Sequence, residues 1–211
     1  MPTDRAVARA LVELGAATLG ESGGRPLRAR VKPAWPGAVL AAPAFPVRCT
    51  PGDNLAVHVG VARAPAGCAL AVEVGDEREI GYWGEVLTTA ALARGVAGLV
   101  IDGCVRDAAA LARHGFPVFS TGLALPGATK SQPGAIGTLA RVGDVDVRAG
   151  DWLVGDADGV TAVPAAALDE VLGAARARAE KEGRLLAALR DGTTTLELLG
   201  LDPTPIEGAG A

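Results

Sequence analysis

Two adjacent charged residues stand where an apolar stretch of the chain ends. Arg106 and Asp107 follow the apolar run in "VAGLVIDGCV" and precede the alanine-rich "AAALARHG". This places them after a predicted buried strand and at the start of a predicted helix, where open α/β sheets have their ligand sites. The alternative is that Asp107 caps the helix and Arg106 is solvated, because Asp is preferred at helix N-caps. Taken alone, the pair favours capping.

A second candidate is the stretch "GYWGEVL", in which Gly84 and Glu85 begin another predicted helix directly after a loop. The free backbone amides of Glu85, Val86 and Leu87 would form an anion-binding end for a carboxylate. The alternative is that Glu85 is a first-turn acid that complements the helix dipole.

Two further candidates lie on predicted helices. Asn54 and His58 in "GDNLAVH" are four residues apart and so project from the same face. The alternative is that Asn54 caps and His58 is an ordinary surface histidine. Glu182 lies on a strongly charged helix face, for which a solvated surface is the default interpretation.

Together, helix-end amides, an Arg-Asp pair and a nearby Glu describe a magnesium site for an α-keto acid. Mg²⁺ prefers oxygen ligands, often keeps several waters and takes one or two protein carboxylates. Asp107 would be the direct ligand and Glu85 would hold metal-bound water.

The elements that position these residues are predicted from periodicity. Strands are expected at 38–45, 46–49, 67–75, 96–102 and 116–121, and helices at 4–19, from 53, at 84–94 and at 107–115. Strand and helix alternate at the spacing of βαβ units, which implies parallel pairing with right-handed crossovers.

The sequence pattern changes from about Gly122. Short apolar stretches there alternate with Gly, Asp and Pro, which predicts an antiparallel or mixed sheet. A last helix is expected over 165–189, followed by a tail. We see no linker, so residues 1–211 are predicted to form a single α/β domain.

Composition excludes several classes of protein. Hydrophobic residues make up 49% and aromatic residues 3%, so the core is expected to be aliphatic rather than built on ring packing. The net charge of -4 and scattered basic residues argue against nucleic acid as a ligand. Three cysteines without a C-x-x-C and two distant histidines indicate reduced thiols and no zinc site. No signal peptide or membrane span is recognised, which predicts a cytoplasmic protein.

The stretches "GDNLAVH", "GYWGEVLTTAALARGVAGLVIDGCVRD", "GFPVFS" and "GDWLVGDADGVTAVP" resemble the 4-hydroxy-4-methyl-2-oxoglutarate aldolase family. This family also contains the regulator of ribonuclease activity A and proteins mislabelled as menaquinone methyltransferases. The resemblance covers nearly the whole chain. It implies a three-layer β/β/α fold similar to a swivelling phosphohistidine domain, and a homotrimer or hexamer with active sites between subunits.

The resemblance also implies an activity. Aldolase members use Mg²⁺ or Mn²⁺ to cleave 4-hydroxy-2-oxo acids and to decarboxylate oxaloacetate through pyruvate enolate. Asp107 matches the metal ligand, and Arg106 the arginine at the keto and enolate oxygen. The amides after Gly84, on Val86 and Leu87, match those that bind the pyruvate carboxylate.

Four more positions are compared with the family. Glu85 falls where the family has an acid that holds metal-bound water, and Glu182 matches an acid that reaches in from a neighbouring subunit. Asn54 and His58 match positions near the distal end of the substrate. The base for the 4-hydroxyl proton stays open among His58, a water and the substrate's own carboxylate.

The sequence departs from the family at Ala110, where an acid is usual, and in the loop that begins "PGATKSQPG", which follows the family pattern only loosely. The main alternative is a non-catalytic regulator of the same fold that binds a ribonuclease or another protein. Retention of Asp107 favours the enzyme. A different metal-dependent lyase or hydrolase is a further alternative. A methyltransferase is not supported, because this sequence has no Gly-rich nucleotide loop after its first strand with an acid beyond it.

Overall fold

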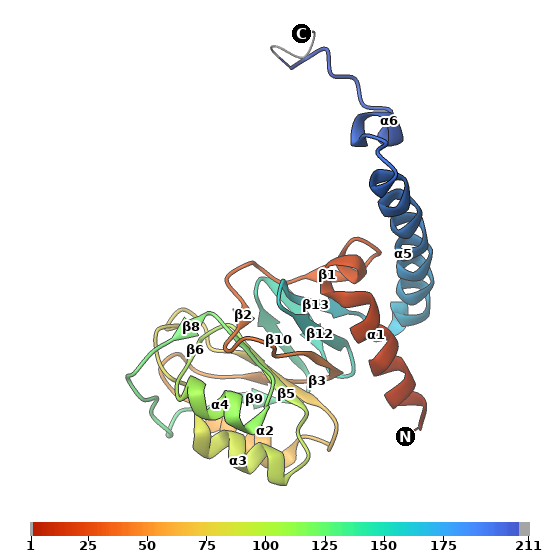
Figure 1. The fold of residues 1–211 in the computed structure, drawn as a ribbon. Helices are drawn as coiled ribbons and strands as arrows, with labels where there is room; N and C mark the ends of the chain where they lie inside the picture. Colours follow the sequence, from red (N-terminus) through yellow and green to blue (C-terminus); the bar gives the residue numbers. More distant parts are fainter. Residues whose placement is uncertain (1, 207–211) are drawn as a thin grey trace.

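The structure is a computed structural model that describes residues 2–206 of the chain. Its centre is one curled sheet in the strand order β1-β13-β12-β3-β4-β5-β7-β2, with β9 paired to β3 (Figure 1). The strands of the sheet are β1 (Arg25–Pro26), β2 (Lys32–Pro33), β3 (Leu40–Arg48), β4 (Ala69–Glu73), β5 (Gly98–Ile101), β7 (Val118–Ser120), β9 (Ala135–Ile136), β12 (Trp152–Asp156) and β13 (Gly159–Val163).

The predicted βαβ units are confirmed. Strands β3, β4, β5 and β7 pair in parallel. The helices between them are α2 (Leu55–Arg63), α3 (Glu85–Ala93) and α4 (Ala108–His114), which lie together over one face of the sheet (Figure 1). Strands β4 and β5 are apolar nearly throughout because a parallel sheet is covered on both faces.

Strand β3 explains the curl of the sheet. We expected two short strands at 38–45 and 46–49, and this division was wrong. The structure has one continuous strand whose neighbours change along its length. Residues 40–43 pair antiparallel with β12, whereas residues 44–48 pair parallel with β4. One strand therefore joins the parallel part of the sheet to its antiparallel part, and the sheet bends where the partner changes.

The bend produces the layers of the fold. One core cluster lies between the parallel strands and helices α2 to α4, and a second lies inside the curl, where the hairpin β10 (Leu139–Val142) and β11 (Val145–Arg148) closes over the sheet. The short strands β6 (Cys104–Val105) and β8 (Gly122–Leu123) pair in parallel at one end. The α/β fold with a β/β/α arrangement is thus confirmed.

Two long helices cover the antiparallel part of the sheet. Helix α1 (Pro2–Gly20) and the first turns of α5 (Leu168–Arg190) pack on β12 and β13 through Leu11, Leu19, Val171 and Leu172. A short 3-10 turn, η1 (Ala165–Ala167), precedes α5. Beyond α5, where we expected only a tail, helix α6 (Thr195–Leu199) forms because Thr194 and Glu197 make a complete capping box.

The core is mostly aliphatic, as predicted, with one exception beside α3. The rings of Trp83 and Phe116 are stacked with centroids 5.7 Å apart, and both side chains are buried in the same cluster as Tyr82. Phe119 is buried in the second cluster, inside the curl of the sheet. Among residues 2–206, no helix combines the length and the apolar character that crossing a membrane would require.

Candidate active site

A cavity of about 180 Å³ lies at the ends of the βαβ units, between α2, the start of α3 and the loop at 126–132. Seven of the nine predicted site residues line it: Asn54, His58, Gly84, Val86, Leu87, Arg106 and Asp107. The side chains of Glu85 and Glu182 do not. The cavity is also lined by Gly81, Tyr82, Trp83, Gly127, Ala128 and Lys130.

Asp107 occupies the N-cap position of α4, as the capping interpretation predicted, but its side chain does not cap the helix. Its backbone has φ 60° and ψ 34°, a left-handed conformation that Asp tolerates better than most residues, and its side chain makes no capping bond to α4. Its Oδ2 instead accepts a hydrogen bond of 3.0 Å from the N–H of Glu85. The Asp107 carboxylate is therefore held at the N-terminus of α3, and both Asp107 and the start of α3 line the cavity.

Gly84 is required at the start of α3 by lack of space. Its φ of −164° is ordinary extended backbone. A Cβ at this position, however, would lie 2.5 Å from Oδ2 of Asp107 and 3.1 Å from Cγ of Arg106. The close approach of the Arg-Asp pair to the helix end therefore depends on a residue without a side chain.

Arg106 lies along the floor of the cavity. Its N–H donates to the carbonyl of Trp83 at 2.8 Å, and its Nε is 3.9 Å from Oδ2 of Asp107. Its side chain runs over Gly81 and Gly127, with Cδ 3.2 Å and Nη1 3.5 Å from where Cβ atoms on these glycines would be. The guanidinium group is about half exposed and faces the cavity as a fixed positive charge.

The start of α3 is anchored by the buried aromatic residues. Nε1 of Trp83 donates to Oγ1 of Thr88 at 2.7 Å, inside the first turn. The amides of Val86 and Leu87 lie in that turn, where no carbonyl of the helix is available to accept from them. With the N–H of Glu85 taken by Asp107, these two amides are the donors that remain for an anion.

Asn54 and His58 contribute unpaired polar atoms. Asn54 is only 5% exposed, and its Nδ2 donates to the carbonyl of Tyr82 at 2.8 Å rather than capping α2. In the described part of the chain, no partner is found for Oδ1 of Asn54 or for Nε2 of His58, and both atoms are buried. A buried polar atom without a partner costs about 1–3 kcal/mol, so both atoms indicate a ligand that supplies the missing hydrogen bonds.

His58 is favoured in its neutral form. Burial lowers the pKa of His58, and the positive charge of Lys130 lowers it further, against an opposing effect of Asp53. A neutral imidazole can accept a proton, which keeps His58 open as a general base.

Lys130 was missed by the sequence analysis. It lies in the Gly- and Pro-rich loop at 126–132, and its Nζ contacts the carbonyl of Ala128 at 3.2 Å. No local pattern distinguishes this lysine from other surface lysines, because the loop reaches the cavity only through long-range contacts.

Asp53 makes those contacts and was also missed, having been considered only as a helix cap. Its carboxylate accepts from Oγ1 of Thr129 at 2.7 Å and from the N–H groups of Ser131, Gln132 and Leu55 at 2.6, 3.1 and 2.8 Å. Burial by itself raises the pKa of Asp53, but these four hydrogen bonds outweigh it and lower the pKa to about 2. An ionised, buried Asp53 therefore fastens the loop against the start of α2.

The two predicted glutamates lie elsewhere in this chain. Oε1 of Glu85 is 3.3 Å from Nε2 of His114 and 3.7 Å from Nη2 of Arg113, so the side chain is directed to the end of α4. Glu182 is on α5 and pairs with Nε of Arg178 at 2.9 Å. Its predicted role at the site of a neighbouring subunit stays a prediction.

The donor set suits one kind of metal. The residues described contain no cluster of three or more His, Cys, Asp or Glu side chains that could hold a metal ion. Asp107 offers a single half-exposed carboxylate, and one of its oxygens already accepts from Glu85. A zinc site would need three or four protein ligands. Mg²⁺ or Mn²⁺, which accept oxygen ligands from water and substrate, fits the remaining oxygen of Asp107.

Comparison with known proteins shows the family of the chain. Residues 11–162 match the family model described as RraA-like, Aldolase/RraA. A protein of Halalkalibacterium halodurans, named "Putative 4-hydroxy-4-methyl-2-oxoglutarate aldolase", is 33% identical over 159 residues, which cover 75% of this chain and 76% of that protein.

Solved structures show the same fold. An uncharacterised protein from Pseudomonas syringae superposes with a TM-score of 0.80 at 27% identity, covering 90% of this chain and 91% of its own. Streptomyces coelicolor RraAS2, described as an unusual member of the RNase ES inhibitor RraA protein family, has a TM-score of 0.72 at 26% identity and covers 84% and 93%. The chain described here belongs to the RraA-like family.

Proposed function

We propose that this protein is a divalent-metal-dependent pyruvate aldolase that cleaves 4-hydroxy-2-oxo acids of the 4-hydroxy-4-methyl-2-oxoglutarate type and also decarboxylates oxaloacetate. The observation that carries the proposal is the convergence of Asp107, Arg106 and the free amides of α3 on one cavity, closed around a glycine that tolerates no Cβ. The names of several relatives support it.

The pyruvate half of the substrate would bind at the start of α3. Its carboxylate suits the N–H groups of Val86 and Leu87, because the N-terminus of a helix combines unpaired donors with the positive end of the dipole. The Asp107 carboxylate accepts from the N–H of Glu85, so the N–H groups of Val86 and Leu87 remain for the substrate.

Arg106 would stabilise the enolate oxygen that forms when the C3–C4 bond breaks. Its guanidinium is held over Gly81 and Gly127 and needs little rearrangement to meet developing negative charge, which is the main way in which enzymes lower such barriers. A cation held by Asp107 would supply Lewis-acid polarisation of the same keto oxygen.

The distal part of the substrate would lie toward α2 and the loop at 126–132. Oδ1 of Asn54 can accept from a substrate hydroxyl, and Nε2 of His58 can accept a proton from it. Lys130 places a positive charge at this end, which suits the second carboxylate of a dicarboxylic substrate. His58, a water and the substrate's own carboxylate all stay candidates for the base.

Pyruvate release from oxaloacetate tests the proposal. We expect release with Mg²⁺ or Mn²⁺ above the rate of the metal alone, loss of release with EDTA, and a fall of about 10³-fold or more in Asp107→Ala, because the metal's charge stabilisation is worth several kcal/mol. Asp158→Ala, at an exposed carboxylate in the β12–β13 turn, is the matched control and should retain full activity. Full activity of Asp107→Ala would remove this residue from the mechanism.

A second candidate is a regulator that binds a ribonuclease. The similarity to Streptomyces coelicolor RraAS2 favours it, since that protein is described as a member of an RNase inhibitor family. No release of pyruvate from oxaloacetate or from 4-hydroxy-4-methyl-2-oxoglutarate, combined with inhibition of a purified RNase E-type enzyme, would replace the aldolase with this function.

A further inference from the structure

Glu85 contacts both ends of helix α4. Its N–H donates to Oδ2 of Asp107, the N-cap residue of α4, at 3.0 Å. Its Oε1 is 3.3 Å from Nε2 of His114, the last residue of α4, and 3.7 Å from Nη2 of Arg113. The backbone of Glu85 therefore binds the beginning of this seven-residue helix, and its side chain binds the end.

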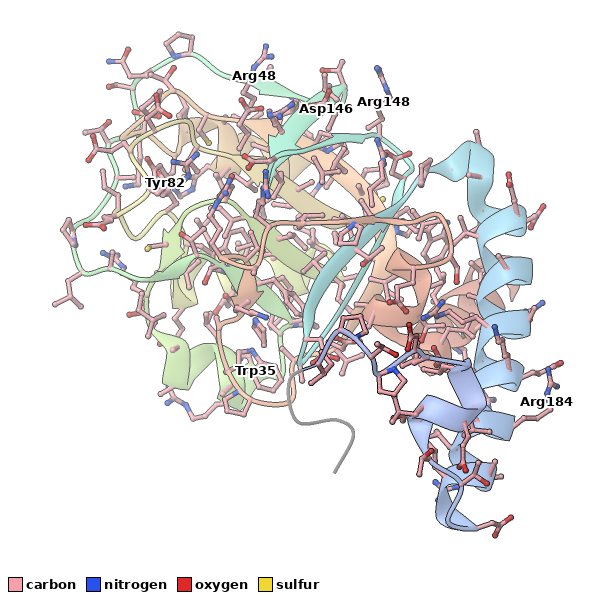
Figure 2. The ribbon with its side chains drawn as sticks, turned by 90° about the horizontal axis from the view of Figure 1, so that it is seen from above. Trp35, Arg48, Tyr82, Asp146, Arg148 and Arg184 are labelled. Carbon is pink, nitrogen blue, oxygen red and sulfur yellow. The ribbon has the colours of Figure 1, made fainter. Side chains whose placement is uncertain are left out.

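The end of α4 is held in place by the core. Leu111 and Phe116 are buried in the cluster between the parallel strands and the helices. Directly after the helix, the carbonyl of Phe116 accepts from Nε1 of Trp35 at 2.9 Å (Figure 2). A side chain that pairs with the end of α4 is therefore attached to a part of the chain that packing already fixes.

The start of α3 needs such an attachment on its exposed side. Gly84 precedes Glu85, and a residue without a side chain gives the backbone more freedom than any other. The bond from Trp83 to Thr88 anchors the first turn on its buried side, but the side chain of Glu85 is exposed. Pairing of Glu85 with the basic end of α4 therefore restrains the first turn from the outside.

Arg113 and His114 have no acid of their own helix to bind. The sequence of α4, AAALARH, contains neither Asp nor Glu, and the position three and four residues before the pair is Ala110. An ionised carboxylate only accepts, so Nε2 of His114 carries the hydrogen in this contact, as neutral and charged imidazole both can. The basic end of α4 is therefore open to an acid from the neighbouring helix.

We propose that Glu85 is a positioning residue, whose side chain is held by Arg113 and His114 so that its N–H keeps the Asp107 carboxylate at the cavity. The inference rests on the proposed aldolase function. It differs from the role that the family resemblance implies, in which this acid itself holds metal-bound water. The side chain of Asp107 lines the cavity and that of Glu85 does not, which favours the positioning role.

Two sets of variants separate the two roles. Glu85→Ala removes the acid, whereas Arg113→Ala/His114→Ala removes its partners and leaves the acid free to turn to the cavity. We expect each to lower kcat for pyruvate release about fivefold, the upper end for exposed ion pairs, with KM for oxaloacetate nearly unchanged because the amides that bind the substrate are retained. The triple variant should lose no more than either, because all three residues act through one contact.

The water-holding role predicts a different pattern. An acid that takes part in proton transfer contributes about 10²-fold or more, so Glu85→Ala would lose at least that much. Arg113→Ala/His114→Ala would then keep the kcat of wild type or exceed it. Either result would overturn the positioning role.

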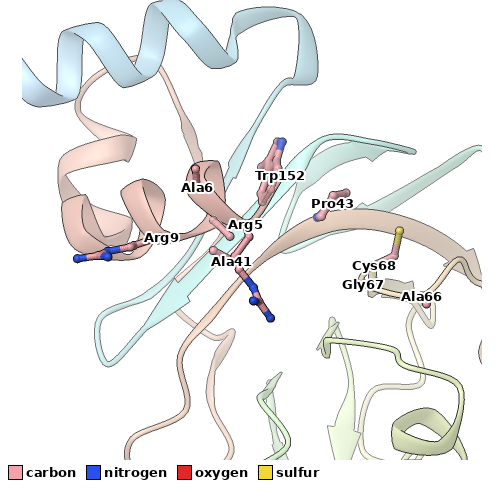
Figure 3. A pocket seen from close by; sticks show the side chains of 10 residues that line it. Arg5, Ala6, Arg9, Ala41, Pro43, Ala66, Gly67, Cys68 and Trp152 are labelled. Atoms are coloured by element: carbon pink, nitrogen blue, oxygen red, sulfur yellow. The ribbon is translucent and has the colours of Figure 1, made fainter. Parts of the chain in front are cut away.

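Conservative and distant variants are the controls. Arg113→Lys/His114→Gln keeps a cation and an N–H donor beside Glu85, so its kcat should stay within about twofold of wild type. Arg9→Ala removes an exposed ion pair of the same kind, since Nε of Arg9 is 2.8 Å from Oε1 of Glu13. Arg9 lies on α1 beside a separate groove (Figure 3), and its variant should match wild type.

Amide hydrogen exchange tests the contact without turnover. The N–H of residue 85 is protected by its bond to Asp107, so its exchange, followed by NMR, should become about three- to fivefold faster in Arg113→Ala/His114→Ala and stay unchanged in Arg9→Ala. Unchanged exchange in the double variant would overturn the positioning role. A wild type that releases no pyruvate would refute the aldolase function, whereas faster exchange would still show that the end of α4 holds this N–H.

Discussion

At the scale of single residues, the site depends on how closely two backbone segments approach. Asp107 adopts a left-handed conformation that costs on the order of 1 kcal/mol for a residue other than glycine, and this conformation directs its carboxylate to α3 instead of α4. Gly84 provides the space for it. The strained backbone of Asp107 and the missing side chain at Gly84 are therefore both needed to hold the carboxylate in this position.

Gly84→Ala should show that the close approach of Asp107 to α3 is needed for catalysis and not only for stability. The added Cβ would stand 2.5 Å from Oδ2 of Asp107, so the carboxylate must move, and we expect kcat/KM for pyruvate release to fall about 100-fold or more, as displacements of 1 Å do at reacting centres. Gly173→Ala is the control, because a Cβ there meets nothing within 4 Å in helix α5. It should stabilise the helix by up to about 1 kcal/mol and leave kcat/KM unchanged. Equal kinetics in both variants would refute the steric argument.

Arg106→Lys tests whether the guanidinium group of Arg106 stabilises the enolate. A lysine keeps the charge but loses the planar, fixed donors of the guanidinium, so we expect kcat to fall about 10²-fold while the dissociation constant for Mn²⁺ changes less than threefold. Steady-state kinetics with oxaloacetate and a Mn²⁺ titration by electron paramagnetic resonance measure the two. A variant that loses metal binding and turnover in parallel would place Arg106 at the metal rather than at the enolate.

At the scale of elements, the loop at 126–132 and helix α2 act together. Asp53 precedes α2 and holds the loop by three of its four hydrogen bonds, which places Lys130 beside His58. The loop is thus part of the cavity wall only because a buried carboxylate fastens it there. The family resemblance is weakest in this loop, and its anchor lies more than 70 residues earlier in the chain.

The anchoring by Asp53 should be visible in how the free energy of unfolding of wild type and of Asp53→Asn depends on pH. The pKa of Asp53 is lowered to about 2, below the usual value near 3.8, so the carboxylate contributes stability above pH 4 that is lost as the pH falls toward 2. At pH 7 we expect Asp53→Asn to lose about 2 kcal/mol, because the amide cannot accept from all four donors. Urea unfolding at pH 7 and at pH 2 measures the difference.

The difference between wild type and Asp53→Asn should be much smaller at pH 2, because this pH is close to the pKa of the wild-type carboxyl and most of the stabilisation by its charge is lost there. Asp158→Asn, at an exposed turn, is the control and should match wild type at both pH values. A destabilisation of Asp53→Asn that is independent of pH would show that shape, rather than charge, holds the loop.

At the scale of the whole molecule, the change of partners along β3 determines the architecture. Pairing with β12 over residues 40–43 and with β4 over residues 44–48 curls the sheet into two layers and leaves helices α2 to α4 on one outer face. The active-site cavity forms at the ends of the parallel strands on that face. Helix α5 extends from the antiparallel part of the sheet, where only its first turns are packed.

The sequence by itself determined most of the central elements and their order. Apolar runs and turn residues predicted strands β4, β5 and β7, the three helices between the parallel strands and the long C-terminal helix, because hydrophobic periodicity is a local property. It also brought seven of nine predicted residues to one cavity, since the ends of parallel strands meet at one edge of a sheet.

Only the tertiary structure decided which donor meets which acceptor. In the folded chain, Asp107 accepts a hydrogen bond from the N–H of Glu85, and the side chain of Glu85 lies at the end of α4. Asp53 binds the loop that carries Lys130 and so brings Lys130 to the cavity. The tertiary structure also made β3 one strand with two sets of neighbours. These outcomes depend on contacts between residues far apart in the chain, whose geometry is set by the packing of the whole fold and leaves no local pattern in the sequence.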